Sequence, residues 1–212
     1  MNLVFNEWLV NAGRLRAFLE REEQLHQLVA KQPGTRATIT ARSCGNPMRF
    51  GRGGLAESPG AVHAILASAE FEAFAAANPA RDITTPLRPL ELYESVTEVG
   101  EAAAALKPGM HLVIVDWTLL PGIGVADAFE NSRKALFELR RDEGGGFVRS
   151  SMYRFLGSPN RYLIVNTSTG RDAVRAAMRA PKMQAFVAGH PASTYAAAAP
   201  AINEYEVFKV TH

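Results

Sequence analysis

The sequence has little that would mark an exported, membrane-spanning or nucleic-acid-binding protein. Its 212 residues include one cysteine, Cys44, so no intramolecular disulfide can form, which fits a reducing compartment. With 23 Lys and Arg against 21 Asp and Glu, the chain offers no basic platform for DNA or RNA. No apolar run approaches the ~18 residues of a membrane span, and Glu7 interrupts an N-terminus that does not resemble a secretion signal. We therefore expect a cytoplasmic protein without nucleic-acid or membrane partners.

Motifs for metals and nucleotides are absent as well. No histidine pair has metal-ligand spacing and there is no CxxC, so we expect no metal site. The GRGG segment from Gly51 lacks the strand-to-helix context of a phosphate-binding loop, and there is no GxSxG elbow. These absences argue against zinc enzymes, dinucleotide-dependent enzymes and serine hydrolases of the elbow type.

The chain contains an internal duplication. LVFNEWLVNAG, starting at Leu3, returns as LVIVDWTLLPG, starting at Leu112. An ordered series of further matches follows in both halves: Gly34 with Gly146, Arg42 with Arg154, Gly45 with Gly157, AFAAANPA with AFVAGHPA, and Tyr93-Glu94 with Tyr205-Glu206. Such a series indicates tandem duplication, and the Pro108-Gly109 loop signal marks the junction. We predict two domains, residues 1–105 and 110–212.

Each half presents the same order of expected elements. A strand is followed by an amphipathic helix, two strands, a second helix and a last strand, and the second helices span residues 59–77 and 171–188. The order β-α-β-β-α-β is the ferredoxin-like arrangement. Its sheet leaves one face without helices, and two such faces can bury apolar area at ~25 cal/mol per Å². We predict an α+β protein whose two ferredoxin-like domains pack sheet to sheet as an intramolecular pseudo-dimer; further association of whole chains stays open.

Several segments carry a resemblance to a known family: LVIVDWTLLPG, the GGGF step, SPNRYLIVN, RDAVRAAMRAPKMQAF and EYEVF. In this pattern, doubled, the chain resembles the antibiotic biosynthesis monooxygenase family of the dimeric α/β-barrel superfamily. The resemblance implies a small cofactor-free oxygenase that oxidises polycyclic aromatics such as anthrones in polyketide and antibiotic synthesis. It also implies a pocket between sheet and helices. A reduced flavin from solution, or haem, stays open as an alternative.

The resemblance also assigns site positions in the third strand of each half. Asn166 matches the family's asparagine, whereas Gly170 stands where the family often has tryptophan. In the first half, Gly54 and Ser58 occupy these two positions. The first half departs further from the pattern, so we expect the second half to keep the better-formed pocket.

An acid occurs at one matched position in both first strands, Glu7 and Asp116. A carboxylate buried there without a partner would have a raised pKa and could take a proton from a phenol or an activated C–H. The alternative is that each acid pairs with an arginine of the same sheet, Arg49 or Arg161. Trp117, on the opposite strand face, is expected to pack where the two sheets meet or to hold an aromatic substrate, as is its counterpart Trp8.

Three further residues are candidates for the site. Asn166 could donate to a substrate carbonyl or an oxygen-derived anion, or could form a turn. Tyr153 could hydrogen-bond to or stack on an aromatic ring, or be structural. His190 could shuttle protons at the pocket rim, or be an exposed loop residue.

These residues leave three functions open. The leading hypothesis is a cofactor-independent monooxygenase acting on a small polycyclic phenol or quinol with O₂, in which Asp116 is the base and Asn166 and Tyr153 are donors. The second is a non-redox isomerase or cyclase using the same base. The third is a non-catalytic small-molecule binding or accessory protein.

Overall fold

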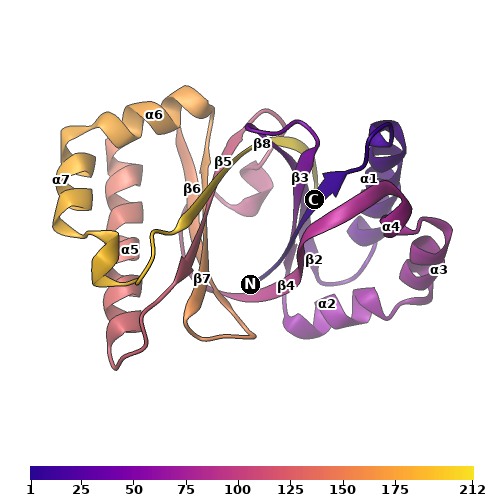
Figure 1. Cartoon of the computed structure of the whole chain (residues 1–212), viewed down its shortest axis with the longest axis horizontal. Coiled ribbons are helices and arrows are strands. Elements are labelled where there is room, and N and C mark those ends of the chain that lie inside the picture. The colour runs from indigo at the N-terminus through magenta and orange to yellow at the C-terminus, as the bar shows by residue number, and fades with distance from the viewer. The chain divides into compact units, whose positions relative to one another are not determined.

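A computed structural model describes all 212 residues (Figure 1). The strands are β1 (Asn2–Val10), β2 (Thr35–Ser43), β3 (Arg49–Ala56), β4 (Thr84–Gly100), β5 (His111–Thr118), β6 (Phe147–Phe155), β7 (Arg161–Ser168) and β8 (Ala201–Thr211). The helices are α1 (Leu15–Ala30), α2 (Pro59–Leu66), α3 (Ala69–Ala77), α4 (Ala80–Ile83), α5 (Val125–Glu143), α6 (Arg171–Arg179) and α7 (Pro181–Gly189), with short 3₁₀ turns at Ala103–Ala105 and Ala192–Thr194. None of the helices is both long and apolar enough to cross a membrane.

Hydrogen bonding orders the strands as β1-β3-β2-β8-β5-β7-β6-β4, and this ladder closes as a barrel. Closure removes the free strand edges that an open sheet would present. The predicted α+β class, with two ferredoxin-like halves combined as in a dimeric α/β barrel, is thereby confirmed.

The chain forms two compact units whose limits differ from the limits of the repeats. Unit 1 comprises residues 1–93 and 205–212, and unit 2 comprises residues 94–204. The last strand of each half, β4 or β8, therefore begins in one unit and ends in the other. In unit 1, β8 pairs antiparallel with β2, matching Thr38 with Thr211 and Ser43 with Tyr205.

In unit 1, β3 is the central partner of β1 and β2. Trp8 pairs with Phe50 and Val4 with Gly54, while Thr38 pairs with Gly54 from the other side. Alternate residues of a strand face opposite sides, so one face of this sheet presents Val4, Asn6, Trp8 and Val10 to the helices. A small core of Val10, Phe18 and Phe50 joins β1 and β3 to α1 at one end.

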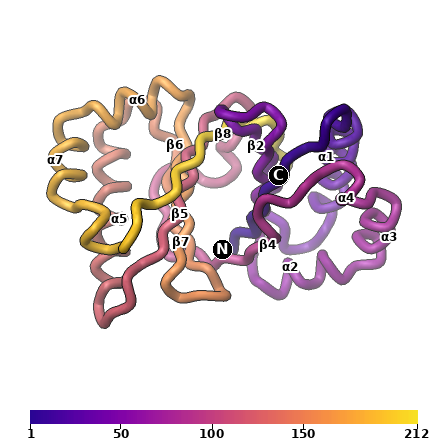
Figure 2. The backbone as a smooth tube through the Cα atoms, viewed as in Figure 1, coloured from indigo at the N-terminus to yellow at the C-terminus, as the bar shows by residue number.

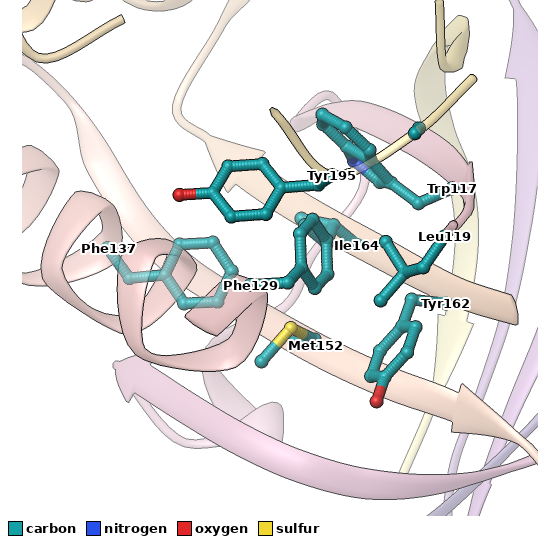
Figure 3. Close-up of a cluster of buried hydrophobic side chains, with 9 residues drawn as sticks. Trp117, Leu119, Phe129, Phe137, Met152, Tyr162, Ile164 and Tyr195 are labelled. Carbon is teal, nitrogen blue, oxygen red and sulfur yellow. The ribbon is translucent and has the colours of Figure 1, made fainter. Parts of the chain in front are cut away.

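Unit 2 repeats the plan with β7 between β5 and β6, and α5, α6 and α7 lie on one face of these strands (Figure 1). Its core is rich in aromatic side chains, with Phe129 at the centre (Figure 3). The ring centroid of Phe129 lies 5.0–5.6 Å from the centroids of three buried rings, those of Trp117, Tyr162 and Tyr195. The helix layer of this unit is therefore filled by large side chains.

The second helix predicted in each half is two helices. The first breaks at Ser68 into α2 and α3, and the second breaks at Ala180 into α6 and α7, where the chain turns (Figure 2). Ser68 accepts a hydrogen bond from the Phe71 backbone N–H, and Pro181 begins α7. A serine cap and a proline in the first turn each favour a new helix start over a continued helix.

Candidate functional site

An apolar cavity lies between the sheet and the helices of unit 1. It is open to solvent on one side, and its interior volume is about 90 Å³. Its floor is the strand row Val4–Gly54–Thr38. Its walls are apolar side chains of α1, β2, β3, α2, α3 and β4: Leu25, Val29, Ala37, Leu55, Ala56, Val62, Ile65, Leu66, Phe71 and Leu90. An apolar slot of this kind, open at its mouth, suits a small, flat, largely apolar ligand.

The cavity wall also carries polar groups that no protein atom satisfies. The hydroxyls of Thr35 and Thr38 are buried without a hydrogen-bond partner. Asn6, only 4% exposed, also lines the cavity. Because buried polar groups in proteins are nearly always bonded, the two threonine hydroxyls are available to a ligand with oxygen substituents.

Arg52 brings a positive charge to the same wall. A buried hydrogen-bond network around Glu22 holds the Arg52 guanidinium in place. Its Nε and Nη2 donate to the two oxygens of Glu22, leaving Nη1 without a protein partner. Thr40 donates to Glu22 over 2.9 Å, and His26 bridges Thr40 and Thr211. Burial opposes the charge on Glu22, but Arg52 and Thr40 outweigh it and lower the pKa of Glu22.

The corresponding space in unit 2 is occupied by protein. The strand row there is Val113–Asn166–Ser150, so an asparagine replaces the glycine of the cavity floor. From α5, Arg140 donates to both Asn166 and Ser150, whereas α1 presents Val29 to the cavity of unit 1. The expectation that the second half keeps the better-formed pocket is therefore wrong, since side chains fill that half.

Glu7 lies on the sheet face that points away from the helices, and so away from this cavity. Arg49 donates to it over 2.7 Å, Tyr205 also donates to it, and Arg88 lies 3.7 Å from its second oxygen. The alternative that Glu7 pairs with Arg49 is confirmed. Burial and the adjacent Glu7 carboxylate raise the pKa of Tyr205, which keeps this tyrosine a hydrogen-bond donor.

The three residues expected to act together, Asp116, Asn166 and Tyr153, are not brought together. Asp116 pairs across the ladder with Leu163, and its neighbour Trp117 packs against Phe129 of α5. Asp116 therefore faces away from the helices, whereas Asn166 faces them. The expectation that Trp117 packs where two sheets meet is wrong, because its strand face is the one that the helices cover.

The remaining candidates have local partners. Tyr153 shares the face of Asp116; burial, with Glu98 nearby, raises the pKa of Tyr153 to about 12. The Arg161 guanidinium lies 4.8 Å from the Phe155 ring centroid. The ring of His190 stacks on Phe186 at 4.1 Å and bonds to its carbonyl, at the end of α7. None of the three lines the cavity of unit 1.

Sequence reasoning missed the polar residues of the cavity: Asn6, Thr35, Thr38 and Arg52. Asn6 immediately precedes Glu7, and strand alternation alone does not say which of two adjacent residues faces the helices. In the structure Phe18 of α1 packs on Phe50, two residues before Arg52 in β3, so Phe50 and Arg52 share the strand face that the helices cover. The GRGG segment lacks the context of a phosphate-binding loop, and its last glycine, Gly54, forms part of the cavity floor instead.

No protein-family model matches the chain, and no curated protein matches it. The fold has close parallels among solved structures. A candidate monooxygenase from Fusobacterium nucleatum superposes with a TM-score of 0.82 at 11% identity, covering 100% of this chain and 94% of that one. An anthrone oxidase-like protein gives a TM-score of 0.67 at 16% identity, with coverage of 99% and 92%.

This chain has their fold. A haem-degrading enzyme from Listeria monocytogenes shares it too, with a TM-score of 0.54 at 10% identity over 99% of this chain and all of that one. At such identities the likeness establishes architecture and leaves chemistry to the residues of the site. The recognised resemblance is thus supported at the level of fold.

Proposed function

We propose that unit 1 is the functional half and that it oxidises a small polycyclic phenol or anthrone-like compound with O₂, without a bound cofactor. The observation that carries this proposal is the apolar cavity with the Thr35 and Thr38 hydroxyls unsatisfied in its wall. The anthrone oxidase-like protein of the same fold supports the substrate class.

The proposed mechanism follows from the one charged side chain that lines the cavity, Arg52. The residues that line the cavity include no acid and no histidine, so no carboxylate faces a substrate as a base. Instead, Nη1 of Arg52 and the Asn6 amide stabilise the enolate oxygen of the substrate, which lowers its pKa so that water can take the proton. Asp116 therefore has no part in this mechanism.

The electron balance needs only O₂. The substrate anion transfers an electron to O₂, and the two radicals combine to a peroxide that loses water. For anthrone, one CH₂ becomes C=O while O₂ supplies one oxygen to the quinone and one to water. The apolar walls hold the two radicals side by side until they combine, and this role requires no metal from the protein.

The test is aerobic and anaerobic incubation with anthrone, following anthraquinone formation and ¹⁸O₂ incorporation. We expect turnover with O₂ only and one labelled oxygen in the quinone. Gly54→Leu should reduce turnover at least tenfold, because a Cβ at Gly54 meets only Val4 at 3.9 Å and the rest of the side chain would enter the cavity. Gly45→Leu is the matched control, since nothing lies within 4 Å of its Cβ.

Turnover of anthrone that is unaffected by Gly54→Leu would refute the proposed site. A second function, non-catalytic binding, is favoured by one observation: Glu22 already neutralises Arg52. In that case Gly54→Leu would abolish anthrone binding in a fluorescence titration while the wild-type protein shows no oxygen uptake. An isomerase or cyclase would convert its substrate without O₂ and without ¹⁸O.

A further inference from the structure

Two threonine hydroxyls of β2 are buried in the wall of the unit 1 cavity without a hydrogen-bond partner, those of Thr35 and Thr38. The next threonine of the strand is different. Thr40 donates to Glu22 over 2.9 Å and lies 2.9 Å from Nε2 of His26. Because buried polar groups are nearly always bonded, the two unbonded hydroxyls call for a reason that Thr40 does not share.

An irregularity of β2 brings these two hydroxyls to the same side of the sheet. Residues three apart on a regular strand face opposite sides. Here the register with β3 shifts directly after Thr35, so that Thr38 pairs with Gly54 of the cavity floor and Thr35 pairs with Ala56, two residues further along β3. Since a strand rises ~3.4 Å per residue, the two threonines stand about 7 Å apart in a row along the cavity wall.

The matching positions of unit 2 leave no hydroxyl unbonded. They are Phe147 and Ser150 of β6, at the same distances from the matched glycine and with the same register shift. Phe147 has no hydroxyl, and Ser150 donates to Asn166 over 2.7 Å and accepts from Arg140. The unbonded pair thus occurs in the unit that has the cavity, and its counterpart is apolar or bonded in the unit where protein fills that space.

We propose that Thr35 and Thr38 are specificity-determining residues of the unit 1 cavity, and that they select a flat aromatic ligand with two oxygen substituents along one edge. Each hydroxyl can donate to or accept from a ligand oxygen, while the apolar walls hold the rings. Both residues lie on β2, whereas the family resemblance assigns only Gly54 and Ser58 in this half. The inference rests on the cavity being the ligand site proposed above, and not on the oxidation step.

The experiment is a fluorescence titration of the full chain under argon with three naphthalenes. In 2,7-dihydroxynaphthalene the two oxygens have about the spacing of the threonine row, ~7 Å. In 2,7-dimethylnaphthalene methyl groups of similar size replace both hydroxyls, and in 2,3-dihydroxynaphthalene the hydroxyls are adjacent. We expect the 2,7-diol to bind about tenfold more tightly than either of the others, although apolar transfer alone favours the dimethyl compound.

Valine variants assign the preference to the two residues. Thr35→Val and Thr38→Val keep the side-chain shape and lose only the hydroxyl, so each should weaken the 2,7-diol about threefold or more and leave 2,7-dimethylnaphthalene unchanged. Thr118→Val, at the exposed end of β5, is the matched control and should change none of the affinities. Gly54→Leu should abolish binding of all three compounds, which places the titrated site in this cavity.

Thermal unfolding separates a ligand-binding role from a structural one. The Tm of Thr35→Val and of Thr38→Val should equal or exceed that of the wild type, because an unbonded buried hydroxyl is removed, whereas Thr40→Val should lower the Tm because its hydroxyl is bonded. A Tm loss in both valine variants as large as that of Thr40→Val overturns the proposal. So does a 2,7-diol that fails to bind, that binds no better than the dimethyl compound, or that is insensitive to both valine variants. The titration contains no O₂, so a failure of anthrone turnover alone refutes the oxidation and leaves this inference standing.

Discussion

At the scale of residues, the two halves handle buried charge differently. The first helix of unit 1 buries Glu22, which accepts hydrogen bonds from Arg52 and Thr40 and lies 3.6 Å from the buried Arg21. The corresponding helix of unit 2 buries Arg133 and Arg140 with no acid. The two units therefore share one backbone plan and differ in the charges that their first helices bury.

His26 gives a pH-dependent contribution to stability. It is wholly buried, and burial lowers the pKa of His26 to about 4 from 6.5, so the folded protein keeps it neutral while the unfolded chain protonates it. Between these values the unfolded state binds more protons, and stability falls as pH falls, by about 1.4 kcal/mol per pH unit. We expect urea unfolding at pH 6 and pH 5 to show a larger loss for wild type than for His26→Gln.

The comparison with His26→Gln isolates this residue, because every carboxylate titrates in both proteins. An equal loss of unfolding free energy in the two proteins over this pH interval would show that His26 is protonated in the folded state as readily as in the unfolded one.

At the scale of elements, the sequence was enough to predict the strands and the first helix of each half. For the second helix it predicted the position but not the break into two helices. The matched segments that start at Leu3 and Leu112 begin one residue after the first residues of β1 and β5. They could be recognised because the alternation and the Trp-Gly spacing recur in both. Ser68 and Pro181 are short-range break signals that an apolar run such as AEFEAFAAA obscures. The direction in which Asn6 or Glu7 points was not predictable, since it depends on which sheet face the helices cover.

The N-terminal cap of α2, a helix that lines the cavity, is expected to stabilise the protein. Ser58 accepts a hydrogen bond from the Ala61 backbone N–H over 3.1 Å, and Pro59 follows it. Ser58→Ala should lower the free energy of unfolding by about 1 kcal/mol, whereas Ser58→Asp should retain most of the cap. Chemical denaturation measures both changes, with Ser158→Ala in an exposed loop as the control. A Ser58→Ala protein as stable as the control would contradict the cap's role.

At the scale of the whole molecule, the duplication preserved backbone geometry more strictly than side-chain chemistry. Gly34 and Gly146 occupy matching positions before β2 and β6, both with positive φ, +82° and +84°. A Cβ on Gly34 would lie 2.7 Å from Ala61, and one on Gly146 would lie 2.8 Å from Ala173, each in the following helix layer. The matched glycines therefore mark a close approach that both units need, whatever each one binds.

This close approach predicts a graded loss of stability. Gly34→Ala and Gly146→Ala must accept both a positive φ and a steric overlap, whereas Gly13→Ala and Gly109→Ala, with φ of +73° and +85° and nothing near the Cβ, accept the backbone cost alone. We expect the controls to lose about 1 kcal/mol and the matched pair to lose about 2 kcal/mol or more, by urea unfolding of the full chain. Equal losses in all four variants would mean that the helices retreat without cost, and that the shared glycines serve the turn rather than the packing of each unit.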